Sequence, residues 1–262
     1  FSPHNGSISS FNNVYIESII ILFMFLGGAN FALHFQLVRR NFSVIFKNPE
    51  FRSYCALILV GILFVTWGLT RVSATGDASQ AFRSAAFTVV SINTTTGFVT
   101  DDFNIWPEYL KLFLLAIMMV GGCSGSTSGS FKVIRIIILL KIIMRELKNL
   151  VHPRAIFHVK VGDKTVDADD LSNVAALTFL FIGFAALGGV ILSSMGVDLT
   201  TALSATVASL FNVGPGLGDV GAMGNYSTIP AMGKGILIFF MLLGRLEIYG
   251  VILLFLPMTW RK

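Results

Sequence analysis

Two short segments of this 262-residue chain place hydroxyl groups and glycine inside otherwise apolar sequence. Residues 91–98 read SINTTTGF, and residues 209–219 read SLFNVGPGLGD. Non-helical backbone at membrane depth is tolerated only where it is buried in protein or lines a wet cavity, and carbonyl oxygens there can replace the hydration shell of a potassium ion. The segments therefore predict an ion-selectivity filter. Its residues are Thr94, Thr95, Thr96, Gly97, Asn212, Val213 and Gly214, with potassium held at Thr95, Thr96, Asn212 and Val213.

The composition indicates a membrane protein. Hydrophobic residues make up 54% of the chain and charged residues 13%, against about 25% charged residues in soluble domains. We expect an all-α polytopic membrane protein whose spanning helices have the roughly 17 to 25 residues needed to cross a hydrocarbon core. The two cysteines, Cys55 and Cys123, lie in or beside apolar runs and indicate neither a disulfide framework nor a metal cluster. The predicted spans are residues 18–38, 53–70, 112–131, 171–197 and 235–257.

Charge indicates that two further segments, residues 78–98 and 199–218, enter the membrane and return to the same side. Basic residues gather in residues 39–52, 132–164 and 261–262, which hold four, eight and two of them. Lys and Arg favour the cytoplasmic side of a membrane. The three basic groups lie on the same side of the membrane if neither of the two segments crosses it by itself. We therefore predict that the Lys/Arg-rich loops and the C-terminus are cytoplasmic. The alternative left open is that the threonines cap helices and a tight turn joins two spans.

An internal repeat aligns residues 84–97 with residues 201–214 without a gap. Each copy ends in polar residues and glycine, and each is followed by a polar loop and an apolar helix. A further copy of that helix begins at Ser18, which indicates that the chain starts just after a filter-like turn. We predict units of helix, re-entrant pore helix, filter loop and helix. The expected divisions are the end of one unit (residues 1–52), a unit with an interrupted helix and a cytoplasmic hairpin (53–170), and a final unit (171–262).

A glycine- and serine-rich run, GGCSGSTSGS, interrupts the apolar sequence between Leu112 and Leu150. Each glycine disfavours a helix by about 1 kcal/mol relative to alanine, so this segment must line water or pack on protein. A flexible loop below a filter is a candidate gate, and its expected mate is Arg245, the lone basic residue of the last apolar span. The alternative is an arginine neutralised by a salt bridge between helices. The predicted gate comprises Gly121, Gly122, Cys123, Ser124, Gly125, Ser126, Thr127, Ser128, Gly129 and Arg245.

Three other features have expected structural roles. Apolar and polar residues alternate about Gly162 and Asp163, which predicts a short hairpin. His34 has no second ligand at metal-binding spacing and is expected to pack. Arg83 is expected to bond acidic loops or backbone near the outer surface.

The sequence does not favour an enzyme. Its apolar segments contain no paired carboxylates and no zinc-ligand spacing, and Ser124 and Cys123 have no base within their segment. We expect no enzymatic activity, no covalently bound cofactor and no nucleic-acid partner. A membrane-embedded enzyme and a non-conducting structural subunit remain the alternatives to an ion-conducting subunit.

Together, the two turns, the run GGCSGSTSGSFKVIR and the segment GRLEIYG resemble the Trk, Ktr and HKT superfamily of potassium transporters, most closely its bacterial TrkH branch. The resemblance covers essentially the whole chain and implies four units around a pseudo-fourfold pore in the inner membrane, with this chain as the C-terminal half. It also implies that Arg245 stands in the pore below the filter as a barrier to cations. Asn212 and Val213 replace threonines, as in other members of this type, so we expect selectivity to be intact. The implied partners are potassium or rubidium ions, a second copy in a homodimer, the remaining N-terminal half of the protein and a cytoplasmic nucleotide-binding regulatory subunit resembling TrkA.

Overall fold

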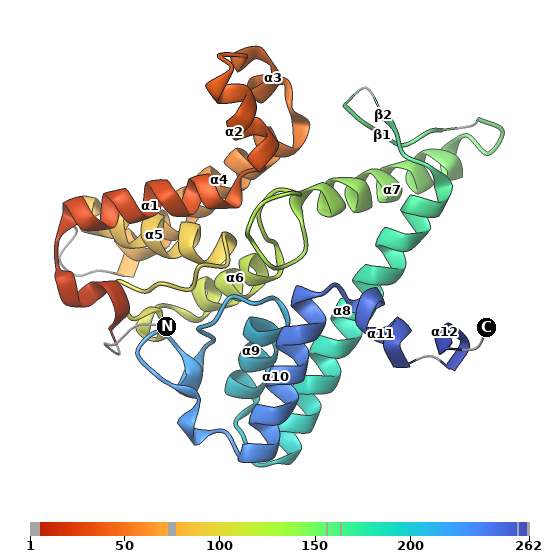
Figure 1. The fold of residues 1–262 in the computed structure, drawn as a ribbon. Coiled ribbons are helices and arrows are strands. Elements are labelled where there is room, and N and C mark those ends of the chain that lie inside the picture. Colours follow the sequence, from red (N-terminus) through yellow and green to blue (C-terminus); the bar gives the residue numbers. More distant parts are fainter. Residues whose placement is uncertain (1–5, 73–76, 156, 163, 256, 261–262) are drawn as a thin grey trace.

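A computed structural model describes residues 6–72, 77–155, 157–162, 164–255 and 257–260 of the chain (Figure 1). The described residues are mostly helical, which confirms the predicted all-α fold. Three parts of the sequence predictions lie outside the described residues. They are the segment before Gly6, the hairpin residue Asp163, and the basic pair Arg261 and Lys262.

Of the described helices, two are long and apolar enough to cross a membrane without a break. Helix α4 spans Pro49–Val72 and helix α8 spans Ala168–Ser194. At about 1.5 Å per residue, both exceed the roughly 30 Å thickness of a hydrocarbon core. They correspond to the predicted spans 53–70 and 171–197.

The first and last predicted spans are bent, so the prediction of one continuous helix in each was wrong. Helices α1 (Val14–Gly28) and α2 (Phe31–Val38) meet at 105°. Helices α10 (Ala231–Arg245) and α11 (Ile248–Phe255) meet at 113°. Each pair is either one broken span or a span followed by a helix that turns away from it.

Polar residues at the two breaks explain the bends. The Asn30 side chain accepts the Ala32 backbone N–H at 2.8 Å and so starts a new helix. At the second break, Glu247 has a left-handed backbone with φ of +58°, which a continuing helix does not allow. The His34 Nε2 atom lies 2.9 Å from the Leu26 carbonyl oxygen across the first bend, so this histidine joins α1 to α2.

The predicted span 112–131 is also interrupted. Helix α6 (Glu108–Met119) ends well before Phe131, and helix α7 (Val133–Val151) begins after it. The chain between them returns to its starting point, because the Gly121 N–H donates to the Phe131 carbonyl at 2.9 Å and the Phe131 N–H donates to the Met119 carbonyl at 3.2 Å. The glycine- and serine-rich run therefore forms a closed loop, and we call residues 121–130 the intramembrane loop.

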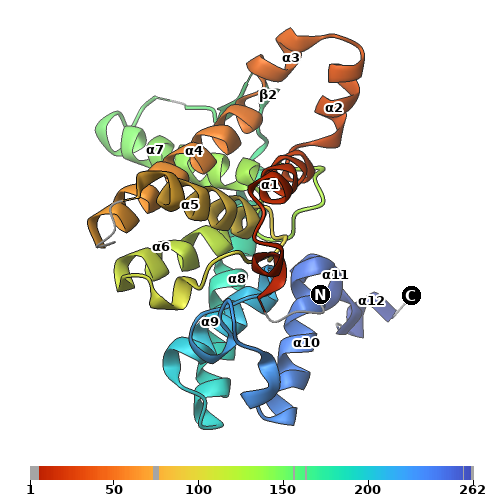
Figure 2. The same ribbon diagram turned by 90° about the vertical axis from the view of Figure 1, so that its left-hand side faces the viewer.

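Helices α5 (Ala78–Asn93) and α9 (Leu199–Leu210) are short and end in the protein interior. At 1.5 Å per residue they measure roughly 24 and 18 Å, too short to cross a hydrocarbon core of roughly 30 Å. Helix α5 packs against α1 and α4, whereas α9 packs against α8 and α10 (Figures 1 and 2). The two short helices thus occupy corresponding places in two groups of longer helices.

The remaining elements are short. The predicted hairpin is present, with β1 (Lys160–Val161) antiparallel to β2 (Lys164–Thr165), and it lies beside α7 (Figure 1). Helix α3 (Phe42–Lys47) follows α2. The other short helices are η1 (Ser7–Phe11), η2 (Phe103–Ile105), η3 (Gly218–Val220), η4 (Tyr226–Thr228) and α12 (Pro257–Trp260).

Candidate functional site

The chain turns sharply at the buried end of α5. Thr95 has φ of +57° and Gly97 has φ of +73°, conformations that end the helix and redirect the chain. The Thr96 N–H donates back to the Ser91 carbonyl at 2.9 Å. The hydroxyl oxygens of Thr94 and Thr96 lie 2.9 Å apart. The first predicted filter segment is therefore a compact turn fixed by bonds to its own helix.

The same backbone pattern recurs at the end of α9. In the alignment of the repeat, Asn212 takes the place of Thr95, and both residues have φ of +57°. The Val213 N–H donates to the Ala208 carbonyl at 2.8 Å, which is the equivalent of the bond that closes the first turn. Gly214 has φ of +112°. The low sequence identity of the two segments thus conceals nearly the same local structure.

The two turns approach each other closely. A β-carbon added to Gly97 would lie 2.2 Å from the Val213 carbonyl oxygen, so only glycine fits at that position. Among the described residues, no hydrogen-bond donor binds the carbonyl oxygens of Thr95, Thr96, Asn212 or Val213. Carbonyl groups of this kind are suitable ligands for a cation. The structure therefore brings the predicted filter residues of both segments together.

Tyr226 supports the second turn from the loop between α9 and α10, a contact that the sequence did not indicate. Its hydroxyl donates to the Gly214 carbonyl at 2.6 Å. Burial raises the pKa of Tyr226 to about 12, so the hydroxyl keeps its proton and remains a donor at neutral pH. A single tyrosine in a polar loop has no pattern that could have revealed this bond.

The intramembrane loop lies against both turns. The Gly129 N–H donates to the Thr95 hydroxyl oxygen at 2.7 Å, and the Ser130 N–H donates to the Phe211 carbonyl at 3.0 Å. A β-carbon on Gly129 would lie 2.8 Å from the same Phe211 oxygen. The loop is therefore in direct contact with both halves of the candidate filter.

The other side of the loop is bonded to the end of α1. The Cys123 N–H donates to the Gly28 carbonyl at 2.8 Å, and the Thr127 N–H donates to the Gly27 carbonyl at 3.2 Å. A β-carbon on Gly122 would lie 2.4 Å from the Gly28 oxygen. The loop thus lies between the end of α1 and the two turns and contacts both.

Further hydrogen bonds hold the shape of the loop itself. The Ser128 hydroxyl accepts the Gly122 N–H at 2.9 Å, and the Ser126 hydroxyl donates to the Cys123 carbonyl at 2.6 Å. The loop that we expected to be flexible is therefore extensively hydrogen-bonded in this conformation. It contains every predicted gate residue other than the arginine, namely Gly121, Gly122, Cys123, Ser124, Gly125, Ser126, Thr127, Ser128 and Gly129.

Arg245 lies beside the loop, in the last turn of α10. Its Nη1 atom donates to the Thr127 carbonyl at 3.2 Å. A cavity of about 190 Å³ separates this part of the loop from α10, and Lys132 and Arg135 also line it. Glu247 pairs with Arg135 at 2.7 Å, and within the described part of the chain Arg245 forms no ion pair. The structure therefore does not favour the alternative of an interhelix salt bridge for Arg245.

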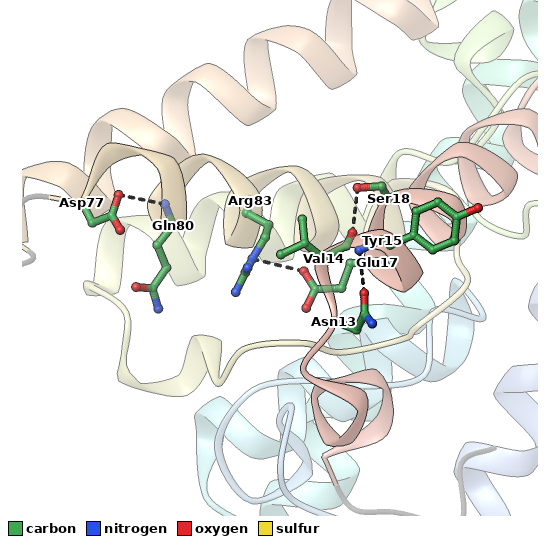
Figure 3. A network of polar contacts seen from close by, with 8 residues as sticks. All are labelled: Asn13, Val14, Tyr15, Glu17, Ser18, Asp77, Gln80 and Arg83. Atoms are coloured by element: carbon green, nitrogen blue, oxygen red, sulfur yellow. Dashed lines mark hydrogen bonds and ion pairs between the residues drawn. The ribbon is translucent and has the colours of Figure 1, made fainter.

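An ion pair joins α5 to α1 far from the turns (Figure 3). The Arg83 Nε atom lies 3.2 Å from the Glu17 Oε2 atom, and Glu17 is only 5% exposed. Arg83 was expected to bond an acidic loop or backbone, but its partner is a carboxylate on a helix. The pair joins the two helices, and removal of Arg83 would leave the carboxylate of Glu17 without a partner in a buried place.

The sequence matches one family along its whole length. The family is described as TrkH, a cation transport protein, and the match covers residues 1–262. The Trk system potassium uptake protein TrkH of Halomonas elongata is 41% identical over 265 residues, which cover 100% of this chain and 54% of that protein. The protein of the same name from Escherichia coli K12 is 38% identical over 267 residues, again covering 100% of this chain and 54% of the relative. The chain thus spans about half the length of the curated relatives it matches.

A solved structure has the same fold. It is the crystal structure of the potassium transporter TrkH from Vibrio parahaemolyticus, with a TM-score of 0.92 and 36% sequence identity. The match covers 100% of this chain and 56% of that one. Because both the family pattern and the fold extend over every part of the sequence, the chain belongs to the TrkH family of cation transport proteins.

Proposed function

We propose that this chain forms part of a potassium uptake protein, in which potassium crosses the membrane through a filter of backbone carbonyl groups. The observation that carries the proposal is the pair of matching turns, which meet closely and in which the carbonyl oxygens of Thr95, Thr96, Asn212 and Val213 accept no hydrogen bond among the described residues. The relatives are named potassium uptake proteins and a potassium transporter, which supports the choice of ion.

The proposed filter residues act through their main chain. Carbonyl oxygens of Thr95, Thr96, Asn212 and Val213 replace water around the ion as it enters. Helices α5 and α9 end next to these residues, and the negative end of each helix dipole favours a cation there. The transported ion is potassium, and the mechanism uses no covalently bound cofactor.

The proposed gate is the intramembrane loop together with Arg245. A cation that leaves the filter meets the loop and then the cavity lined by Arg245, Lys132 and Arg135. Of the described residues that line this cavity, Glu247 is the one with a carboxylate, and it already pairs with Arg135. The excess of positive charge in the cavity repels a cation that leaves the filter. Conduction therefore requires the loop and the arginine to move.

The proposed assembly contains more than this chain. Two matching turns supply half of a pore built from four units, with residues 1–52 as the end of one unit and residues 53–170 and 171–262 as two further units. The rest of the protein supplies the other turns. We place the assembly in the bacterial inner membrane as a homodimer with its basic loops on the cytoplasmic side, where a nucleotide-binding subunit resembling TrkA docks.

Rubidium uptake into vesicles that contain the purified full-length protein tests this function. We expect uptake that added potassium inhibits and added sodium does not. Folded, correctly inserted protein that shows no such uptake, even when Arg245 is replaced by alanine to remove the barrier, would contradict the proposal. Turnover of a substrate without ion flux would favour the membrane-embedded enzyme instead.

A further inference from the structure

Glu50 in the first turn of α4 is a buried carboxylate that contacts the intramembrane loop. It is 7% exposed, and its Oε1 atom accepts the Ser124 backbone N–H at 2.6 Å. Among the described residues, it is the only carboxylate hydrogen-bonded to the loop. Hydrogen bonds that involve a charged group are roughly twice as strong as neutral ones. Glu50 therefore makes a strong bond to the part of the loop that faces away from the turns.

The same carboxylate also reaches the start of α7. The Ile134 backbone N–H, in the first turn of that helix, faces this carboxylate. The N-cap residue Lys132 provides no side-chain cap of its own, so Glu50 places a carboxylate near this helix N-terminus from a neighbouring helix. A negative charge at a helix N-terminus is favourable. One side chain on α4 thus holds both the loop and the helix that follows it.

The remaining bonds of the loop lead in other directions. Cys123 and Thr127 are bonded to the end of α1, and Gly129 and Ser130 are bonded to the turns. Within the described part of the chain, only the Glu50 bond connects the loop to the first turn of α4, directly after the link formed by α2 and α3. A movement of α2 and α3 would be transmitted to the intramembrane loop through the Glu50 carboxylate.

We propose that Glu50 is a positioning residue that tethers the intramembrane loop to α4 and α7 and so holds it against the filter turns. The tether itself follows from the contacts of Glu50, whereas its effect on ion flux rests on the proposed function. A loop without its tether leaves the turns more often. Loss of the carboxylate therefore increases flux without a change in the filter.

Cys123 reports on the tether directly. It adjoins Ser124 in the loop, and its side chain is fully buried, so a thiol reagent reaches it only when the loop moves. Glu50 borders a cavity of about 1510 Å³ that is also lined by residues of α7, α8, α11 and the hairpin, through which the reagent can approach Glu50. The experiment uses full-length protein in vesicles, with every cysteine other than Cys123 replaced by serine.

Two variants separate the charge from the hydrogen bond. Glu50→Ala removes the acceptor, and we expect about tenfold faster labelling of Cys123 by a small methanethiosulfonate, as expected for loss of one charge-assisted hydrogen bond. Glu50→Gln keeps a neutral acceptor, so we expect a smaller increase. Maximal rubidium flux should rise in the same order, while the potassium-to-sodium ratio and the half-saturating rubidium concentration stay unchanged.

Glu146→Ala is the matched control, because Glu146 is an exposed acid on α7 that pairs with its neighbour Arg145. It should alter neither labelling nor flux. Unchanged labelling in folded Glu50→Ala protein, or in Glu50→Gln protein if the alanine variant does not fold, overturns the tether. Faster labelling with unchanged flux upholds the tether and contradicts the gating role of the loop, so the two proposals fail separately.

Discussion

Replacing Gly97 by alanine should weaken the discrimination between potassium and sodium. Gly97 has φ of +73°, and a β-carbon at this position would lie 2.2 Å from the Val213 carbonyl oxygen. Ordinary contacts between non-bonded heavy atoms lie at roughly 3.5 Å, so the two turns must move apart by about 1 Å. The moving atom is a carbonyl oxygen of the proposed filter, and its position sets the fit to the ion.

The substitution has two effects. A left-handed backbone with a side chain costs about 1–2 kcal/mol of folding stability, whereas the displaced carbonyl changes the fit to the ion. Each 1.4 kcal/mol corresponds to a factor of ten in an equilibrium constant. We therefore expect the potassium-to-sodium selectivity ratio to fall by roughly tenfold or more, since displaced carbonyls no longer replace the hydration shell and both ions then pass with more of their water.

The assay is rubidium uptake into vesicles with competing potassium or sodium, and Gly196→Ala is the control. Gly196 has φ of +88° and no heavy atom within 4 Å of an added β-carbon. That variant has the same kind of backbone strain without the clash, so it should lower the melting temperature and leave the selectivity ratio unchanged. Normal selectivity in folded Gly97→Ala protein would refute the assignment of this turn to the filter.

Three further predictions concern charged and polar contacts around the turns. Arg245→Ala should increase rubidium flux severalfold, because it removes a positive charge that has no ion-pair partner among the described residues. Tyr226→Phe should reduce the loss of thermal stability between pH 10 and 12. The pKa of Tyr226 is about 10 in the unfolded chain and is raised to about 12 in the folded protein. The stability that the protonated hydroxyl contributes is therefore complete below the unfolded pKa and is lost as the pH rises through the folded pKa. Glu17→Gln should lower the melting temperature, since it leaves Arg83 without its partner, and the double variant Glu17→Gln/Arg83→Gln should recover part of the loss.

Each of these predictions has a control and a contradicting result. Arg154 is exposed in the segment that follows α7, and Arg154→Ala should leave flux unchanged. Equal flux in the Arg245 variant and wild type would argue against a barrier. Tyr15→Phe, at an exposed tyrosine, should keep the wild-type profile of stability against pH. A double variant no more stable than Glu17→Gln alone would show that the ion pair is not the reason for the loss.

The turns could be predicted from sequence because their cause is local. Threonines and a glycine at the end of a short apolar helix restrict the backbone, and the alignment of the two copies places Thr95 opposite Asn212 before any coordinates are known. The glycine- and serine-rich run could be located for the same reason. The assignment of these segments to a filter and a gate stays a prediction.

The bends could not be predicted from hydropathy, because each depends on one polar residue within an apolar stretch. Asn30 starts α2 with a single side-chain hydrogen bond, and Glu247 ends α10 with a left-handed backbone. Averages over a membrane-length window remove such signals. The contacts of Glu17, Glu50 and Tyr226 were missed for another reason, since each joins residues that are distant in sequence and share no local pattern.

The close packing of the intramembrane loop changes how its glycines should be understood. Gly122 and Gly129 lie where a β-carbon would meet a backbone oxygen at 2.4 and 2.8 Å, so they permit close approach rather than flexibility. Among the described residues, two backbone N–H groups of the loop donate to α1, two donate to the turns and one donates to Glu50. At about 1 kcal/mol net for each, opening requires about 5 kcal/mol, which favours the closed loop by roughly several thousandfold. In the proposed assembly, a regulatory subunit must therefore bind the open form more tightly by a similar factor, because a partner with equal affinity for both forms would leave the flux unchanged.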